Sequence, residues 1–258
     1  MYGAPIWCSA LRRSKEHQRN LNRAWKRIAI RVISAYKTVA LDAALLLARL
    51  PPLILLADAR RRIYDESSRL RRKKQLTAQR TRAIRTEEML TLREEWLDHL
   101  SRRGNWGRIT IEAVIPEFDC WLDRGHGRVS FHLTQLLTGH GCFSAFLYKI
   151  RKLDNPRCTS CGGAVLDTAD HTWRICSRWE INRRELVEIV GPDLSLRGIV
   201  HAMLRGERDW NAVSSFANSV MCIKEEEERA REGILPDPYL TFPPDTQEEM
   251  AQLDSEID

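Results

Sequence analysis

The residues with the clearest chemistry lie in one short segment of this 258-residue chain. Cysteines at positions 158 and 161 precede a histidine at 171 and a cysteine at 176, in the pattern Cys-x2-Cys-x9-His-x4-Cys. Cysteines at this spacing can bind one ion from a tight turn, and Gly162 and Gly163 permit the positive φ angles of such turns. Three sulfurs and one imidazole nitrogen form a tetrahedral ligand set for zinc. The spacing therefore predicts a CCHC zinc knuckle with the ligands Cys158, Cys161, His171 and Cys176.

The predicted zinc is structural, because four protein ligands leave no position for a reactive water. The alternative is a set of unlinked thiols beside a surface histidine. The remaining cysteines lie among apolar residues and are expected to be buried thiols: Cys8, Cys120, Cys142 and Cys222. The total of seven is odd, which argues against a disulfide framework and favours a reducing compartment.

Trp173 lies inside the predicted metal-binding segment, between His171 and Cys176. Two roles are open to it, because an indole can stack on an unpaired nucleic acid base or pack against the module itself. Other tryptophans occupy apolar positions of helical patterns and are expected in the core: Trp96, Trp106, Trp121 and Trp210.

Basic residues are dense from Arg60 to Arg85, where only Asp65 and Glu66 are acidic. Residues 1–108 contain 25 Lys and Arg against 10 Asp and Glu, whereas residues 225–258 contain 2 against 12. A charge run is often only the solvated face of a helix, but this density favours contact with nucleic acid phosphates. The predicted nucleic-acid-binding residues are Arg60, Arg61, Arg62, Arg69, Arg71, Arg72, Lys73 and Lys74, together with Trp173 as a stacking residue.

The sequence lacks the motifs of common catalytic sites. It has no GxxxxGK(S/T) or GxGxxG loop, no GxSxG nucleophile and no Asp-Asp pair. Two-metal phosphoryl transfer needs clustered carboxylates on rigid strands, and the sequence shows no such pair. We therefore predict no catalytic residue in this chain. Runs of about 18–20 uncharged apolar residues are also missing, so no membrane partner is expected.

Hydrophobic periodicity predicts an all-α fold around the small metal module. The expected helices cover about 14–48 with a continuation to Leu50, 53–103 as one or two long helices, 111–122, 131–137, 143–150, 179–190, 195–204 and 209–232. Residues 233–258 are acidic, contain four prolines and show no periodicity, so this tail is expected to be disordered.

Several segments together resemble the reverse transcriptases of non-LTR retrotransposons. Residues 2–7, YGAPIW, resemble the start of that family's thumb region. Residues 27–40, RIAIRVISAYKTVA, are similar to its aYRTvS helix, with Lys37 where arginine is usual. The turn at 50–53, LPPL, matches the one that follows this helix.

The resemblance continues along the chain. Residues 131–143, which contain FHLTQ and LTGHGCF, look like the LTQxLTGHGxF box that precedes the family's zinc knuckle. The CCHC residues and then Lys224-Glu225 follow in the family's order. The resemblance covers most of residues 1–232 and points to the type-1 elements inserted in arthropod ribosomal DNA.

This resemblance implies the carboxy-terminal part of a polyprotein that joins an RNA-directed DNA polymerase to an endonuclease for target-primed reverse transcription. The family's fingers and its palm with the Tyr-x-Asp-Asp centre, which would hold Mg²⁺, have no matching positions here, so this sequence is expected to be a fragment and only the zinc ligands are carried over. Implied partners are the element RNA, the target DNA and the rest of the polyprotein, in the nucleus. The alternative is a non-catalytic, zinc-containing assembly module in which the Arg-rich helix pairs with the acidic tail.

The resulting division of the chain has six parts. They are a thumb-like helical region at 1–56, a basic long-helix linker at 57–108, a helical segment at 109–154, the CCHC zinc knuckle at 155–180, carboxy-terminal helices at 181–232 and the acidic tail at 233–258.

Overall fold

The computed structural model describes residues 3–102 and 106–233, and the regular elements in this part are helices. The α-helices are Ala4–Arg13 (α1), Lys15–Val32 (α2), Leu41–Leu47 (α3), Leu53–Arg72 (α4), Ala78–Arg102 (α5), Arg108–Val114 (α6), Phe118–Asp123 (α7), Phe131–Thr138 (α8), Ser144–Lys149 (α9), Ala169–Arg174 (α10), Glu180–Val190 (α11), Leu196–Arg205 (α12) and Glu207–Arg231 (α13). Short 3-10 helices cover Ile115–Glu117 (η1), Thr159–Cys161 (η2) and Ser177–Trp179 (η3). The all-α prediction is confirmed over these residues, while the tail expected to be disordered lies, from residue 234, outside them.

The helix predicted over residues 14–48 is divided in the structure. Ser14 begins α2, because its hydroxyl accepts a hydrogen bond of 3.2 Å from the amide of His17. At the other end, Ser34 has a φ of 49°, in the left-handed region, and the chain returns to helix only at Leu41. In the described part of the chain, none of the helices combines the length and apolar character needed to cross a bilayer.

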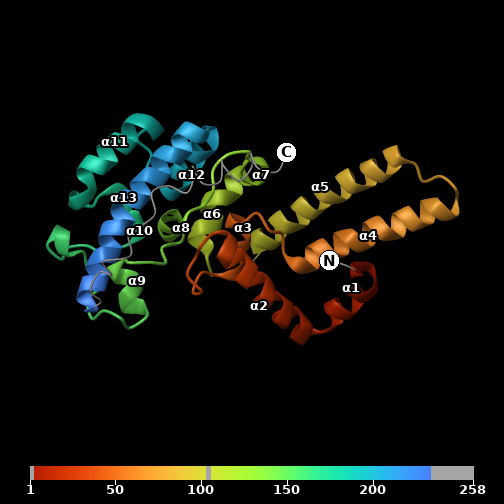
Figure 1. Cartoon of the computed structure of the whole chain (residues 1–258), viewed down its shortest axis with the longest axis horizontal. Coiled ribbons are helices and arrows are strands. Elements are labelled where there is room, and N and C mark those ends of the chain that lie inside the picture. Colours follow the sequence, from red (N-terminus) through yellow and green to blue (C-terminus); the bar gives the residue numbers. More distant parts are fainter. Residues whose placement is uncertain (1–2, 103–105, 234–258) are drawn as a thin grey trace, which may run out of the picture.

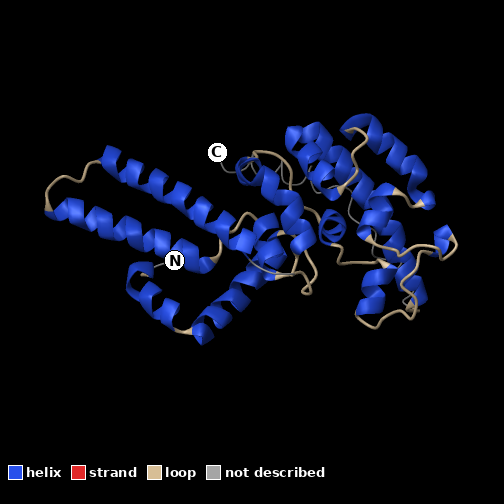
Figure 2. Ribbon diagram, turned by 180° about the vertical axis from the view of Figure 1, so that it is seen from behind, coloured by secondary structure: helices blue, strands red, loops and turns tan. Residues whose placement is uncertain are grey.

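The molecule is elongated, with a helical hairpin at one end (Figure 1). α4 and α5 lie side by side and project away from the other helices, with α1 packed along the base of α4. At the opposite end, α13 packs against α8, α11 and α12. Figure 2 shows the same division from behind. The hairpin tip and the metal-binding segment therefore lie at opposite ends of the long axis.

One large apolar core joins α2 and α3 to the carboxy-terminal helices. Trp96, Trp121 and Trp210 are buried in it, as the sequence predicts. The prediction for Trp106 is wrong, because its side chain is 80% exposed. It precedes α6 in a turn where the next residue, Gly107, lies so close to α3 that an added Cβ would be 2.9 Å from two alanine methyls. Cys120 is likewise exposed rather than buried, on the outer side of α7.

Paired charges join the two helices of the hairpin and hold α1 against it. Arg62 on α4 binds two carboxylates of α5, with Nε 2.6 Å from Glu88 Oε2 and Nη1 3.0 Å from Glu95 Oε1. Asp58 is buried beneath α1, where the Arg12 guanidinium and the Cys8 thiol both bind its carboxylate. Burial alone would raise the pKa of Asp58, but these two partners hold it below its usual range.

The turn between α7 and α8 contains a glycine that the core requires. Gly127 has a φ of 74°, and a Cβ there would lie 2.1 Å from the Trp210 ring. We expect Gly127→Ala to destabilise the fold by about 2–3 kcal/mol, because a left-handed alanine and an overpacked indole both cost free energy. Gly125→Ala is the matched control, since its Cβ would contact nothing within 4 Å. Equal midpoints for the two variants in urea denaturation would contradict this account of the turn.

Candidate metal centre

The four predicted zinc ligands converge on one point of the structure. The ligand atoms of Cys158, Cys161, His171 and Cys176 all lie within 4.8 Å of one another. The Sγ atoms of Cys158 and Cys176 are 3.8 Å apart, and Cys161 Sγ is 3.5 Å from His171 Nε2. In a tetrahedral zinc site, bonds of about 2.3 Å to sulfur and about 2.0 Å to nitrogen place two sulfurs about 3.8 Å apart. They place a sulfur and a nitrogen about 3.5 Å apart. The set therefore has the chemistry and the spacing to hold a metal such as zinc.

A tight turn and a short helix present these ligands. Around the first two cysteines, the amide of Gly163 donates to Cys158 O at 2.9 Å, and the amide of Cys158 donates to Val165 O at 2.8 Å. An isolated bridge between Arg157 and Leu166 closes this loop. Thr168 then caps α10, because its hydroxyl accepts from the amide of His171 at 3.1 Å, and the histidine ring lies in the first turn.

The protonation state of each ligand depends on how deeply its side chain is buried and on its hydrogen bonds. Burial lowers the pKa of His171, which favours the neutral imidazole that binds metal. Burial raises the pKa of Cys176 to about 12, so this thiol stays protonated at neutral pH without an ion. Hydrogen bonds from Ser177 lower the pKa of Cys161. Metal binding is therefore expected to release protons from the thiols.

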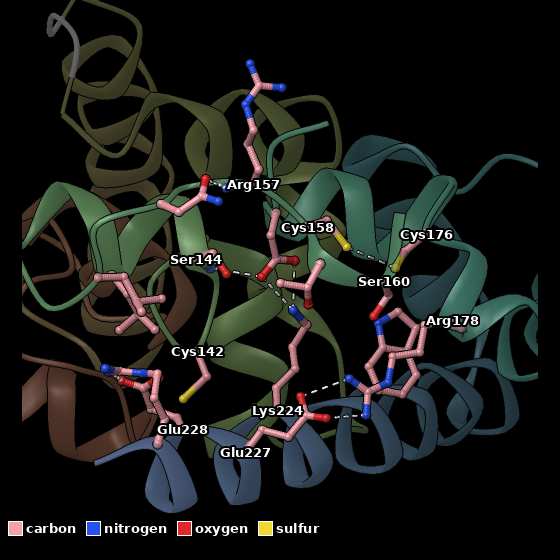
Figure 3. Close-up of a pocket in the computed structure, with 17 residues that line it drawn as sticks. Cys142, Ser144, Arg157, Cys158, Ser160, Cys176, Arg178, Lys224, Glu227 and Glu228 are labelled. Carbon is pink, nitrogen blue, oxygen red and sulfur yellow. Dashed lines mark hydrogen bonds and ion pairs between the residues drawn. The ribbon is translucent and has the colours of Figure 1, made fainter. Parts of the chain in front are cut away.

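The metal segment is docked on α13 and α9 by a buried ion pair. Asp167, which is 5% exposed, accepts from Lys224 Nζ at 2.8 Å and from the amide of Ser144 at 2.8 Å. Figure 3 shows Lys224 reaching from α13 toward this loop, and Arg178 beside it paired with Glu227 at 2.9 Å. A cavity of about 240 Å³ lies between these elements, and the Asp167–Lys224 and Arg178–Glu227 pairs line it.

Trp173 packs inside the protein, which corrects one of its two predicted roles. Its side chain is 1% exposed and stacks on Phe216 of α13, with the ring centroids 5.0 Å apart and the planes at 14°. Arg183 donates to the carbonyl of Trp173 at 3.0 Å and holds this turn in place. Since no face of the indole is open, stacking on a nucleic acid base is excluded in this conformation, and the packing alternative holds.

The predicted nucleic-acid-binding residues of the hairpin differ in their pairing and exposure. Arg62 is paired with Glu88 and Glu95 at the base of the hairpin, and Arg69 is paired with Glu66 on its own helix. Arg61 is half-buried on α4. The others are exposed, and within the described part of the chain none of them is seen in an ion pair: Arg60, Arg71, Arg72, Lys73 and Lys74. Arg82 and Arg85 on α5 share this exposed tip.

Sequence reasoning missed the residues that dock the metal segment. Asp167 and Lys224 are 57 positions apart, so no local pattern joins them. One signal was present, because Lys224 is the only lysine after Lys152 and follows an apolar stretch of a helix. Gln135 and Glu225 form a second such pair, in which the amide of Gln135 donates to the carboxylate of α13.

The chain is similar in sequence to one characterised class of mobile element. It is 31% identical over 116 residues to a "Retrovirus-related Pol polyprotein from type-1 retrotransposable element R1" of Popillia japonica, and the match covers 44% of this chain. The chain spans less than half of that relative, since the match covers 42% of its length. No family model and no solved structure matches. The similarity supports a retrotransposon-related protein with a general role in a retroelement polyprotein.

Proposed function

We propose that this chain is the carboxy-terminal, nucleic-acid-binding part of a retrotransposon polyprotein that carries out target-primed reverse transcription. In this proposal the CCHC residues form a zinc knuckle that folds the carboxy-terminal region. Its partners are the element RNA, the target DNA and the rest of the polyprotein, and any Mg²⁺ belongs to a polymerase part outside this chain. The similarity to a retroelement Pol polyprotein and the four converged ligand side chains support it.

The exposed hairpin tip is the observation that carries the binding proposal. Arg71 and Arg72 end α4, Lys73 and Lys74 follow, and Arg82 lies on the facing helix. Within the described residues none of these side chains is seen in an ion pair, and the hairpin holds them away from the body (Figure 1). Unneutralised cations on a projecting arm attract a polyanion and release its counterions on contact. The hairpin therefore supplies contacts to the phosphate backbone rather than to base edges.

Removing charge from the tip is expected to weaken binding and to reduce its salt dependence. In the triple variant Arg71→Gln, Arg72→Gln and Lys73→Gln, the slope of log K against log salt for single-stranded RNA should become shallower by about 2, because each lost phosphate contact removes about 0.7. Glutamine keeps the helix propensity of α4 close to that of arginine and lysine. Fluorescence anisotropy across a salt series measures both quantities.

A matched control removes the same charge elsewhere. Arg128, Arg197 and Arg208 are exposed residues of the body, outside the hairpin, and their triple glutamine variant should keep the wild-type slope. If both triple variants lose the same affinity, binding follows net charge alone and the hairpin has no special role. If the wild-type chain does not bind RNA or DNA at all, the proposed function is wrong.

An assembly module is the second candidate, and exposed apolar residues beside the metal segment favour it. Ile175 and Ile181 are 62% and 71% exposed on neighbouring elements, next to the ligand Cys176. Such side chains suit a contact with another part of a polyprotein. Truncation after Gly233 separates the two candidates. Nucleic acid affinity should stay level or rise under the binding proposal, whereas loss of folding or of self-association would favour the assembly module.

A further inference from the structure

A second group of cations gathers on the body, where the α2–α3 loop meets the α8–α9 loop. His140 of the second loop and Thr38 of the first are hydrogen bonded, with Nδ1 2.9 Å from Oγ1. The His140 ring also packs on Phe146 of α9, at a centroid distance of 4.7 Å. These contacts fix the imidazole at the junction of two segments that lie 102 residues apart in the chain.

The chain places two lysines at this junction, because Lys149 follows Phe146 by one turn of α9 and Lys26 of α2 is bonded to the backbone beside Thr38. Burial and, to a smaller extent, the charges of Lys149 and Lys26 together lower the pKa of His140 to about 4. Lys26 on α2 is held in place, because its Nζ donates to Lys37 O at 2.9 Å. Burial lowers the pKa of Lys26 as well, and no acidic group offsets this effect.

The two chain segments that meet at the junction contain no acid of their own, and the carboxylates that approach its loops come from α13, where Glu225 acts on Tyr36 and Cys142. Residues 17–41 and residues 124–153 contain neither aspartate nor glutamate, although they contain six and five Lys or Arg. The outer face of α2 adds Arg23 and Arg27, which are exposed. A partly buried ammonium beside like charges costs free energy unless an anion completes the site. The arrangement therefore has the character of an anion seat.

We propose that Lys26, Lys149 and His140 hold one phosphodiester group of a bound nucleic acid chain. This seat rests on the proposed function, since its occupant is the same polyanion that contacts the hairpin. A phosphodiester suits it because the two ammonium groups supply charge and the imidazole, neutral at pH 7, supplies an Nε2 atom that the Thr38 contact leaves for a second hydrogen bond. The seat continues the basic face of α2, so a nucleic acid chain whose phosphates follow this helix reaches His140.

The first test removes the two ammonium groups in the whole chain. The double variant Lys26→Ala and Lys149→Ala should bind a single-stranded RNA of about 20 nucleotides about tenfold more weakly, and the salt slope should become shallower by about 1. The matched control is Arg197→Ala with Arg208→Ala, two exposed cations on α12 and α13. Equal losses in the two double variants would overturn the seat. Circular dichroism confirms that each variant is folded.

The second test observes the seat directly and separates two sources of phosphate. The ring resonances of His140, assigned by comparison with His140→Gln, should move with RNA and saturate along the binding curve. Inorganic phosphate should move them only weakly at about 10 mM, because one free ion lacks the additional contacts of a chain. Equal movement with dilute inorganic phosphate would assign the site to a small anion instead. Resonances that stay fixed while RNA binds would overturn the seat and leave the hairpin proposal intact, whereas absence of all RNA binding would overturn both.

Discussion

Loss of the metal is expected to unfold the segment from Arg157 to Cys176 while the surrounding helices stay folded. The regular structure of this segment is a three-residue 3-10 turn, one isolated bridge and the six-residue α10. Helices this short have little stability of their own. Zinc binding in comparable peptides contributes on the order of 10–16 kcal/mol, which exceeds any other single contact in the segment. Hydrogen exchange with and without a chelator should show the loss of protection, confined to this segment.

A pair of cysteine variants makes this expectation specific. Cys161→Ser should lose zinc, measured by atomic absorption, and should lose protection over the same residues as the chelated wild type. Cys120→Ser removes an exposed thiol outside the site and should leave zinc content at one ion per chain. Protection that persists in metal-free Cys161→Ser would show that the Trp173–Phe216 stack and the Asp167 contacts hold the segment without an ion. Wild-type protein that binds no zinc would refute the knuckle itself.

The fold could be predicted where each helix carries its own signal. Three such signals act within a few residues: the acidic and apolar stripes of α5, the proline pair before α4 and the glycine after α11. The observed bounds of these helices agree with the expected ones. The four metal ligands could also be predicted from a local signal, because their spacing in the sequence indicated that they would meet, and they do. Breaks that depend on one residue, such as the left-handed Ser34, leave no periodic trace and were missed.

The errors arose where a contact joins distant parts of the chain. Trp173 has the same local sequence whether it faces solvent or Phe216, which is 43 positions away, and only the docking of the segment on α13 decides between them. Arg62 belongs by sequence to a uniform basic run, yet the register of the hairpin places it opposite Glu88 and Glu95. Composition predicted that this part of the surface carries positive charge. The ion pairs across the hairpin, which composition does not predict, determine which of these cations can still contact a ligand.

Breaking the Asp167–Lys224 pair is the second change with a large expected effect. Both side chains are about nine-tenths buried, so Asp167→Ala leaves an ammonium inside the protein without its carboxylate. Such an uncompensated charge typically costs about 3–5 kcal/mol. The amide of Ser144 loses its acceptor in the same variant, which adds to the loss. Urea denaturation of the zinc-loaded chain should therefore show a marked fall in the free energy of unfolding.

A double-mutant cycle separates the pair from its individual members. Lys224→Met in the Asp167→Ala background should recover part of the loss, because it removes the stranded charge and keeps an apolar side chain of similar length. The half-exposed pair Arg178–Glu227 is the matched control, with an expected coupling of about 0.2–1 kcal/mol. Equal couplings in the two pairs would mean that water reaches Asp167 as freely as it reaches Glu227. Since Asp167 lies between the paired cysteines and His171, its variants should also lower the affinity for zinc, and this connects the metal site to α13.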